Sequence, residues 1–303
     1  MSILTVGTVA FDDIETPFGK VEKVIGGACT YISWAASYFT NDIRLTSVVG
    51  GDFPDEEIRE LEGRGVNMEG LKVLSNGKTF FWAGKYHENM NMRDTITTDL
   101  NVLDDFDPEL PASYYDSKYV MLGNLTPEIQ NRVIDQLSNP RLIVLDTMNF
   151  WMDIALENLK KAISRVQVLT INDEEARQLS GEYSLVNAAE KIFEMGPKYL
   201  VIKKGEHGAL LISPDQMFYA PALPLSMVKD PTGAGDTFAG GFIGHLAKTD
   251  DLSFENLKRA VIYGSAMASF CVEEFSLTKM KKLSQDDIRL RVQKFVDITS
   301  FDV

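Results

Sequence analysis

Several residue types are scarce in this chain of 303 residues, and each scarcity argues against a class of protein. Only two cysteines occur, Cys29 and Cys271, outside any C-x-x-C pattern, which argues against a disulfide-built scaffold and a structural zinc site. The three histidines, His87, His207 and His245, have no partners at metal-binding spacing, so no histidine-based metal site is expected. Basic residues are outnumbered 44 to 30, giving a net charge of −14. Because domains that hold nucleic acid carry a basic surface, no nucleic-acid partner is expected.

Long apolar runs are also missing, and no segment approaches the roughly 20 residues that a membrane-spanning helix needs. The opening residues, MSILTVGTVAFDDIE, lack the basic start and the apolar stretch of a secretory signal. No low-complexity tract, charge block or Pro/Gly/Ser-rich linker divides the chain, whose composition is that of a globular protein. We therefore expect a cytoplasmic protein without a membrane partner, folded as one α/β domain over residues 1–303.

Strand and helix patterns alternate along most of the chain. Short apolar runs predict buried strands, and longer segments with apolar residues at helical spacing predict helices between them. The predicted strands are 3–7, 44–49, 119–122, 142–145, 166–171 and 200–203. The predicted helices are 28–39, 55–64, 127–138, 153–164, 173–180 and 185–195, with three more beginning at Ala234, Phe254 and Gln285. This order predicts right-handed crossovers and a mostly parallel central sheet.

Two stretches, residues 11–25 and 78–99, interrupt this alternation. The first is rich in β-forming residues around a Pro17-Phe18-Gly19 turn, and the second has one aromatic arm and one Thr-rich arm. Both predict β-hairpins. Ligands of open α/β sheets bind at the carboxyl ends of the strands, so these insertions would make a small lid over the site. The alternative is a pair of ordinary edge hairpins.

The segment KDPTGAGDTFAGGFIGHL, residues 229–246, carries the clearest chemical pattern. Gly233, Ala234 and Gly235 let the backbone turn with its amides pointing one way, at the positive end of the helix that follows. That arrangement is an anion hole suited to a transferring phosphoryl group. Asp236, in the first helical turn, could accept the proton of an attacking hydroxyl. The alternative for Asp236 is a carboxylate that merely caps the helix.

The run DPTGAGDTFAGGF is similar to the C-terminal signature of the ribokinase (PfkB) kinases. The resemblance implies a three-layer ribokinase-like α/β fold with a mostly parallel central sheet and a small β lid. It implies an ATP-dependent kinase that transfers the γ-phosphoryl group to a hydroxyl of a sugar or related small molecule. Asp236 would be the catalytic base, and Gly233, Ala234 and Gly235 the anion hole. A nucleoside kinase of the same family is the alternative, and the lid is a candidate surface for a homodimer.

Other segments resemble motifs of the family in the expected order. Asn172-Asp173-Glu174-Glu175 is similar to its N-x-x-E motif, which implies that Asn172 and Glu175 organise Mg²⁺ and phosphate. Hard oxygen ligands at a helix start suit Mg²⁺, although a plain helix cap explains the same pattern. The resemblance places Lys204, Gly205 and Gly208, together with Thr232, on the nucleotide side.

The acceptor side is implied by residues near the N-terminus. Asp12 resembles the aspartate that binds substrate hydroxyls, and Gly26-Gly27 resembles the double glycine that hinges the lid. Tyr31 stands where the family usually has a sugar-binding asparagine, so the acceptor pocket is expected to differ from that of an ordinary ribokinase. The aromatic run 80–82 is closer to the nucleoside-kinase branch, since aromatic rings can stack on a base.

Two further classes were weighed. A nicotinamide-dependent dehydrogenase is disfavoured because no G-x-G-x-x-G follows the first predicted strand, and the absence of G-x-x-x-x-G-K-[ST] excludes P-loop kinases. A metabolite-binding regulator on the same fold, with its chemistry lost, is the non-enzyme alternative. An intact Asp236 argues against it, because a pure binder needs no base.

Overall fold

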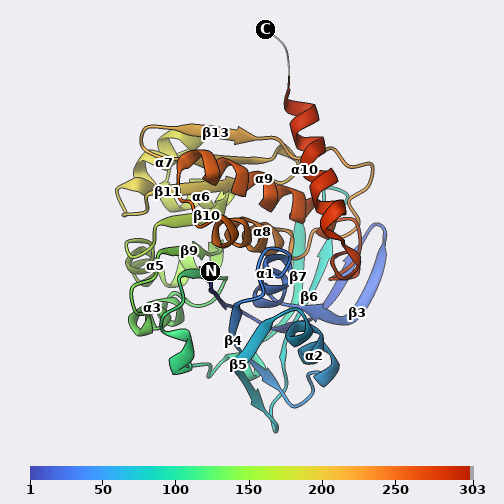
Figure 1. The fold of residues 1–303 in the computed structure, drawn as a ribbon. Coiled ribbons are helices and arrows are strands. Elements are labelled where there is room, and N and C mark those ends of the chain that lie inside the picture. Colours follow the sequence, from blue (N-terminus) through green and yellow to red (C-terminus); the bar gives the residue numbers. More distant parts are fainter. Residues whose placement is uncertain (301–303) are drawn as a thin grey trace.

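A nine-stranded sheet forms the centre of the molecule, as a computed structural model describing residues 1–300 shows (Figure 1). Its strand order is β13-β12-β11-β10-β9-β8-β1-β4-β5. The pairs from β11 to β5 are parallel, and only β12 and β13 are added antiparallel. The strands are β1 (Ile3–Val6), β4 (Ile43–Gly50), β5 (Val66–Leu74), β8 (Tyr119–Leu122), β9 (Leu142–Asp146), β10 (Val168–Asn172), β11 (Tyr199–Lys203), β12 (Ala209–Ile212) and β13 (Met217–Ala220).

Helices cover both faces of this sheet and make the three layers. One face carries α1 (Ala28–Ala36), α2 (Asp55–Gly63), α8 (Ala234–Thr249), α9 (Phe254–Cys271) and α10 (Gln285–Thr299). The other carries α3 (Pro127–Gln136), α4 (Asn149–Ile154), α5 (Leu156–Ile163), α6 (Asp173–Ser180) and α7 (Leu185–Phe193). Neighbouring strand residues such as Ile3 and Leu4 belong to opposite cores. Burial on both faces is why the central strands are continuous apolar runs.

A second, small sheet lies beside the first, toward the right in Figure 1. Its strands are β2 (Ala10–Thr16), β3 (Gly19–Gly26), β6 (Phe80–Tyr86) and β7 (Arg93–Asp99), in the order β3-β2-β6-β7. It consists of two antiparallel hairpins joined by the parallel pair of β2 and β6. The fold class predicted from the sequence is therefore confirmed: a three-layer α/β fold with a mostly parallel sheet and a small β unit.

The helix predicted over residues 153–164 differs from the structure in one respect. Two helices, α4 and α5, meet at Ala155, whose φ of −139° and ψ of 31° are not helical. This break lets Trp151 donate a hydrogen bond to Asn124 at 2.8 Å and lets Met152 become buried. No glycine or proline marks the site, so the sequence pattern gave no signal for the break.

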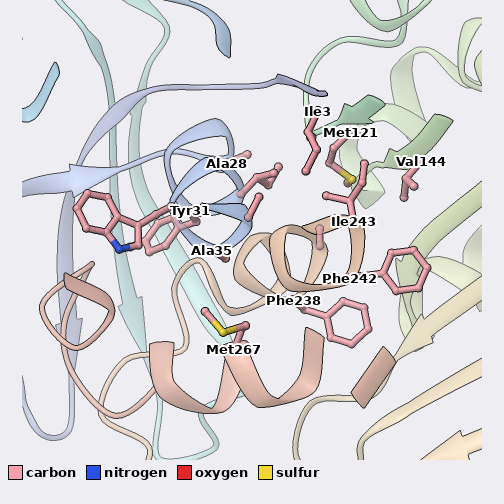
Figure 2. Packing of buried hydrophobic residues seen from close by; sticks show 14 of the residues in the cluster. Ile3, Ala28, Tyr31, Ala35, Met121, Val144, Phe238, Phe242, Ile243 and Met267 are labelled. Atoms are coloured by element: carbon pink, nitrogen blue, oxygen red, sulfur yellow. The ribbon is translucent and has the colours of Figure 1, made fainter. Parts of the chain in front are cut away.

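Helices α1 and α8 pack face to face through glycines. A Cβ on Gly240 would lie 2.4 Å from the carbonyl oxygen of Ile32, and one on Gly244 would lie 2.7 Å from the ring of Phe39. Figure 2 shows the two helices side by side, with Phe238, Phe242 and side chains of the sheet around them. Because Gly240 and Gly244 have no side chains, α8 packs closer to α1 than it could with any other residue at these two positions.

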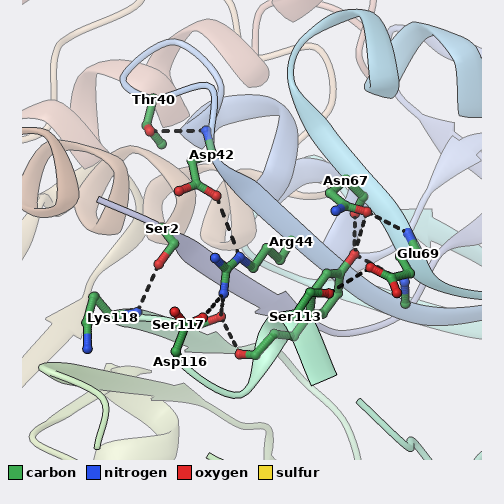
Figure 3. A network of polar contacts seen from close by, with 12 residues as sticks. Ser2, Thr40, Asp42, Arg44, Asn67, Glu69, Ser113, Asp116, Ser117 and Lys118 are labelled. Atoms are coloured by element: carbon green, nitrogen blue, oxygen red, sulfur yellow. Dashed lines mark hydrogen bonds and ion pairs between the residues drawn. The ribbon is translucent and has the colours of Figure 1, made fainter. Parts of the chain in front are cut away.

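Polar contacts at the amino ends of the strands fix the opposite edge of the sheet (Figure 3). Arg44, at the start of β4, donates to Asp116 at 2.6 Å and to Ser117 at 3.1 Å. The Ser2 hydroxyl accepts a hydrogen bond from the backbone amide of Lys118 at 3.1 Å. All these contacts lie at the amino ends of the strands, away from the carboxyl ends where ligands of open α/β sheets bind. No helix within residues 1–300 is long and apolar enough to span a membrane.

Candidate active site

Asp12 lies on β2, directly beyond the carboxyl end of β1. Its side chain is only 4% exposed, and no group within residues 1–300 donates a hydrogen bond to its carboxyl. Burial raises the pKa of Asp12 to about 8, with repulsion from Asp230, Asp236 and Asp13 adding to the shift. A Cβ on Gly26 would lie 1.9 Å from Asp12 Oδ2. The Asp12 carboxyl therefore occupies the space that a side chain at position 26 would need, so only glycine fits there.

Gly27 turns the chain from the small sheet into α1. Its φ is 92°, and a Cβ there would lie 2.5 Å from the Thr8 carbonyl oxygen. The first helical amide, that of Ala28, donates to Thr8 Oγ1 at 2.9 Å. The double glycine predicted as part of the acceptor site thus lies against the chain leading to Asp12, with Gly26 in direct contact with it.

The glycine-rich turn starts α8 close to these residues. Gly233 has a φ of 73°, and a Cβ on it would come within 2.5 Å of the Tyr31 ring. Tyr31 therefore fills the space beneath the turn, and its buried hydroxyl has no hydrogen-bond partner in the described residues. Burial, followed by nearby Cys271, Asp12 and Asp230, raises the pKa of Tyr31 well above its ordinary value. Tyr31, which stands where an asparagine was expected, therefore supports the glycine turn and lies near Asp12.

Asp236 lies in the first turn of α8, partly exposed. Burial raises the pKa of its carboxyl to about 7, helped by repulsion from Asp146, whereas Lys203 and Arg93 pull it down. A carboxylate with a pKa near neutrality can both accept and hold a proton at physiological pH. Ala234 and Gly235, between Gly233 and Asp236, complete the turn at the amino end of the helix.

Thr232 and Asp230 tie this turn to two other parts of the molecule. The Asp230 carboxylate accepts from the backbone amides of Thr232 at 2.8 Å and Ser276 at 3.1 Å. The Thr232 hydroxyl contacts the Tyr86 hydroxyl on β6 at 3.1 Å. Asp230 and Tyr86 are structural supports of the site that the sequence did not single out.

Lys203 ends β11 beside Asn172, its partner in the register with β10. Its ammonium contacts Asp146 Oδ2 at 2.9 Å, with Asp146 only 5% exposed. It also lies 3.3 Å from the position of a Cβ on Gly235. Although burial acts to lower the pKa of Lys203, Asp146, then Glu175 and Asp236, raise it. The sequence analysis missed Lys203, although its place as the last residue of a predicted strand was a signal.

Asn172 and Glu175 form a capping box at the start of α6. Asn172 Oδ1 accepts from the Glu175 amide at 2.8 Å, and Glu175 Oε2 accepts from the Asn172 amide at 2.7 Å. Burial raises the pKa of Glu175 to about 7, against the pull of Lys203. The capping alternative is therefore present in the structure. One carboxylate oxygen of Glu175 stays outside the box.

The loop from Lys204 to Gly208 follows β11. Gly205 has a φ of 54°, and a Cβ on it would lie 2.5 Å from Asn91 Oδ1 in the turn between β6 and β7. Gly208 packs so tightly that a Cβ would lie 2.0 Å from the Ala220 carbonyl oxygen. The Lys204 ammonium lies over the Tyr219 ring, 5.6 Å from its centroid. The small sheet thus reaches across the site to the loop predicted on the nucleotide side.

These residues converge at the carboxyl edge of the main sheet, below the small sheet. Asp12 comes from β2, and Asp236 from a helix more than 200 residues later, yet Asp236 is close enough to help raise the pKa of Asp12. The arrangement combines a buried carboxyl, a second carboxyl with a pKa of about 7 and a glycine turn at a helix start. It suits transfer of an anionic group to a hydroxyl.

Comparison with known proteins places the chain among the phosphotransferases that act on an alcohol group. The model of the pfkB family of carbohydrate kinases matches residues 4–282. The chain belongs to this family and is a sugar or nucleoside kinase. Kinases of the family use ATP.

Similar proteins and structures agree with this family. A cytidine kinase of Thermococcus kodakarensis is 27% identical over 248 residues, covering 80% of this chain and 87% of that protein. A nucleoside kinase of Methanothermobacter thermautotrophicus is 26% identical, covering 90% of this chain and 89% of that protein. The crystal structure of a Methanocaldococcus jannaschii nucleoside kinase matches with a TM-score of 0.77 at 21% identity, covering 97% of this chain and 99% of its own. A ribokinase from Thermotoga maritima matches with a TM-score of 0.76 at 20% identity, over the same shares of the two chains.

Proposed function

We propose that this protein transfers the γ-phosphoryl group of ATP to a hydroxyl of a sugar or related small molecule, with Asp236 as the base. The observation that carries the proposal is the convergence of Asp12 and Asp236 around the Gly233 turn. A buried carboxyl without a side-chain donor, such as that of Asp12, is costly unless a ligand supplies a partner, and the half-buried Asp236 lies close enough to share that ligand. A polyhydroxy acceptor supplies such partners, since its hydroxyls can donate to both carboxyls.

In the proposed reaction, Asp12 orients the acceptor and Asp236 takes the proton of the attacking hydroxyl. The hydroxyl oxygen then bonds to the γ-phosphorus, and the backbone amides of residues 233–235 stabilise the charge on the transferring group. The amino end of α8 adds partial positive charge at the same point. Tyr31 keeps the turn in place from below.

The donor is proposed to lie along the loop after β11 and the start of α8. Gly205 gives a close backbone approach, and Thr232 stands at the entrance to the anion hole. Lys204 and Gly208 complete the proposed nucleotide side, with Gly208 holding the loop against β13.

Asn172 and Glu175 are proposed to organise Mg²⁺ beside the phosphates. Within residues 1–300, no group of three acidic, histidine or cysteine side chains could hold a metal alone. The fit is nevertheless good, because Mg²⁺ keeps most of its waters and binds through one or two carboxylates together with substrate phosphates. The Glu175 carboxylate oxygen that lies outside the capping box is a hard ligand of the kind Mg²⁺ prefers. When bound, the ion would neutralise phosphate charge.

A nucleoside acceptor is the second candidate, and the small sheet favours it. Trp82 is opposite Asp12 in the parallel register of β2 and β6, so the two side chains share one face of the sheet. The neighbouring Tyr86 on that face contacts Thr232. An indole ring beside a hydroxyl-binding carboxyl suits a base attached to a ribose. The cytidine and nucleoside kinases among the similar proteins agree with this acceptor.

Phosphotransfer from ATP to a panel of sugars and nucleosides tests the proposal. Asp236→Asn keeps the size of the side chain but cannot accept a proton, so turnover should fall by about 10²–10⁴-fold while ATP affinity changes little. The control is Asp215→Asn, an exposed carboxylate in the turn before β13, which should leave turnover unchanged. For the native enzyme, kcat/KM should fall as the pH drops below about 7, because Asp236 must be deprotonated to act. Near-normal turnover of Asp236→Asn would refute the assigned base.

A further inference from the structure

Lys203 is a positive charge enclosed by the acidic groups of the site. Its side chain is 18% exposed, and its ammonium contacts Asp146 Oδ2 at 2.9 Å. Glu175 and Asp236 also act on it, and its ammonium borders Gly235 in the proposed anion hole. The lysine therefore lies beside both the turn that would receive the phosphoryl group and the strand end that would receive the metal.

A phosphoryl group entering this site meets a strongly acidic environment. The chain carries a net charge of −14, and five acidic side chains converge here: Asp12, Asp146, Glu175, Asp230 and Asp236. Backbone amides and one metal ion supply only part of the positive charge that the triphosphate requires. Arg93, the other basic group acting on Asp236 and Glu175, is exposed on the small sheet. Lys203, in contrast, is largely buried among the acidic side chains of the site.

We propose that Lys203 is a catalytic residue whose ammonium leaves Asp146 and binds the transferring phosphoryl group. This inference rests on the proposed function. The exchange is feasible because Asp146 keeps a second partner: its Oδ1 accepts from the Thr147 amide at 2.9 Å. Asp146 thus holds the lysine ready in the free enzyme and stays hydrogen-bonded once the lysine has turned toward Gly235.

In the transfer step, Lys203 acts through charge alone. The acceptor oxygen forms its bond to the γ-phosphorus as the bond from that phosphorus to the β–γ bridging oxygen breaks. The electron pair of the broken bond stays on ADP, and the hydroxyl proton goes to Asp236. Lys203 keeps its proton and donates hydrogen bonds to the equatorial oxygens, where charge accumulates.

The test compares Lys203→Met with Lys203→Arg and with Lys198→Met. Lys198 is an exposed lysine just before the other end of β11, so its variant removes one positive charge without touching the site. For Lys203→Met, kcat should fall about 10²–10³-fold, as for loss of one oxyanion donor. By calorimetry, this variant should lose affinity for a non-hydrolysable ATP analogue but keep that for ADP, which lacks the transferred group. Lys203→Arg should recover part of kcat, and Lys198→Met should match the native enzyme.

A merely structural ion pair would behave differently. Lys203→Met leaves Asp146 buried without its cation, so the double variant Asp146→Asn/Lys203→Met should regain thermal stability while kcat stays low. Recovery of kcat along with stability would overturn the proposal, as would equal losses of affinity for ADP and the ATP analogue. If the native enzyme phosphorylates no sugar or nucleoside, the proposed function fails. If it is active and Lys203→Met keeps its rate, only this inference fails.

Discussion

At the scale of single residues, Asp12 and Asp13 are neighbours with different surroundings. Asp12 is buried, and no side chain or amide in the described part of the chain donates to its carboxyl, whereas Asp13 Oδ1 accepts from the Lys23 amide at 2.6 Å within the small sheet. Asp12→Ala would leave acceptor hydroxyls unpaired, at a cost of roughly 1–3 kcal/mol. The KM for the acceptor should therefore rise about ten- to a hundredfold, while the KM for ATP stays nearly constant.

Asp13→Ala is the matched control, and steady-state kinetics with each substrate varied in turn decides between the two residues. The Asp13→Ala variant should leave the KM for the acceptor unchanged. The reverse pattern would mean that the acceptor pocket is shifted by one residue along β2. No effect from either change would show that the acceptor is not held through hydroxyls at this strand end.

The sequence identifies a site residue most readily where the backbone conformation or a close approach requires one residue type, such as glycine. Gly233 and Gly26 leave a visible pattern, because one needs a positive φ and the other leaves room for Asp12. No backbone requirement marks Lys203 or Lys204. Lys203 ends the apolar strand β11 and contacts Asp146, whereas Lys204 follows the strand and lies over Tyr219. The resemblance pointed to the loop that begins at Lys204 and so passed over its neighbour.

At the scale of elements, the two hairpins decide which acceptor the site admits. Trp82→Ala removes the only indole on the Asp12 face of β6 (Phe80–Tyr86) and leaves the strand pairing intact. If a base stacks there, the KM for a nucleoside should rise about tenfold or more, since such stacking is worth roughly 1–3 kcal/mol. The KM for a free sugar should not change, because a sugar has no base.

Trp82→Phe is the control for this prediction, measured with both acceptors. It keeps an aromatic face and should keep most of the nucleoside affinity. If Trp82→Ala raised both KM values equally, the indole would act by shaping the small sheet, where its ring covers Gly84. The nucleoside alternative would then lose its main support.

Helices and strands were predictable from the sequence where burial produces a simple pattern of apolar residues. The central strands are apolar on both faces, and their helices have one apolar stripe, so most were located. Strand β5 escaped because it is largely exposed and mixes polar with apolar residues. Strand β13, with Met217 and Tyr219 half-exposed at the sheet edge, was missed for the same reason.

At the scale of the whole molecule, the edge of the small sheet formed by β7 is a candidate surface for association with a second copy of the chain. Strand β7 carries Ile96, 63% exposed, with Met92 and Leu100 at its two ends 58% and 44% exposed. Unpaired strand edges with exposed apolar residues associate unless they are covered. The predicted homodimer through the lid would cover this edge.

Sedimentation analysis of the native protein and of Ile96→Asp tests this assembly. The native protein should sediment as a dimer, and the charged variant should be shifted toward monomer. Val186→Asp, at a half-exposed apolar position on α7, is the control and should stay dimeric. A native protein that remains monomeric at tens of micromolar would disprove the prediction.

The glycine contacts between α1 and α8 have a consequence for how this scaffold can change its acceptor. They hold the helix that follows the double glycine close against the helix that carries Asp236, at a separation that leaves no room for a Cβ at Gly240. The position of Asp236 is thereby fixed by α1, although Tyr86 of β6 still contacts Thr232 in the turn before it. We expect that substitutions at Trp82, which leave the contact between Tyr86 and Thr232 in place, change the preferred acceptor without moving Asp236.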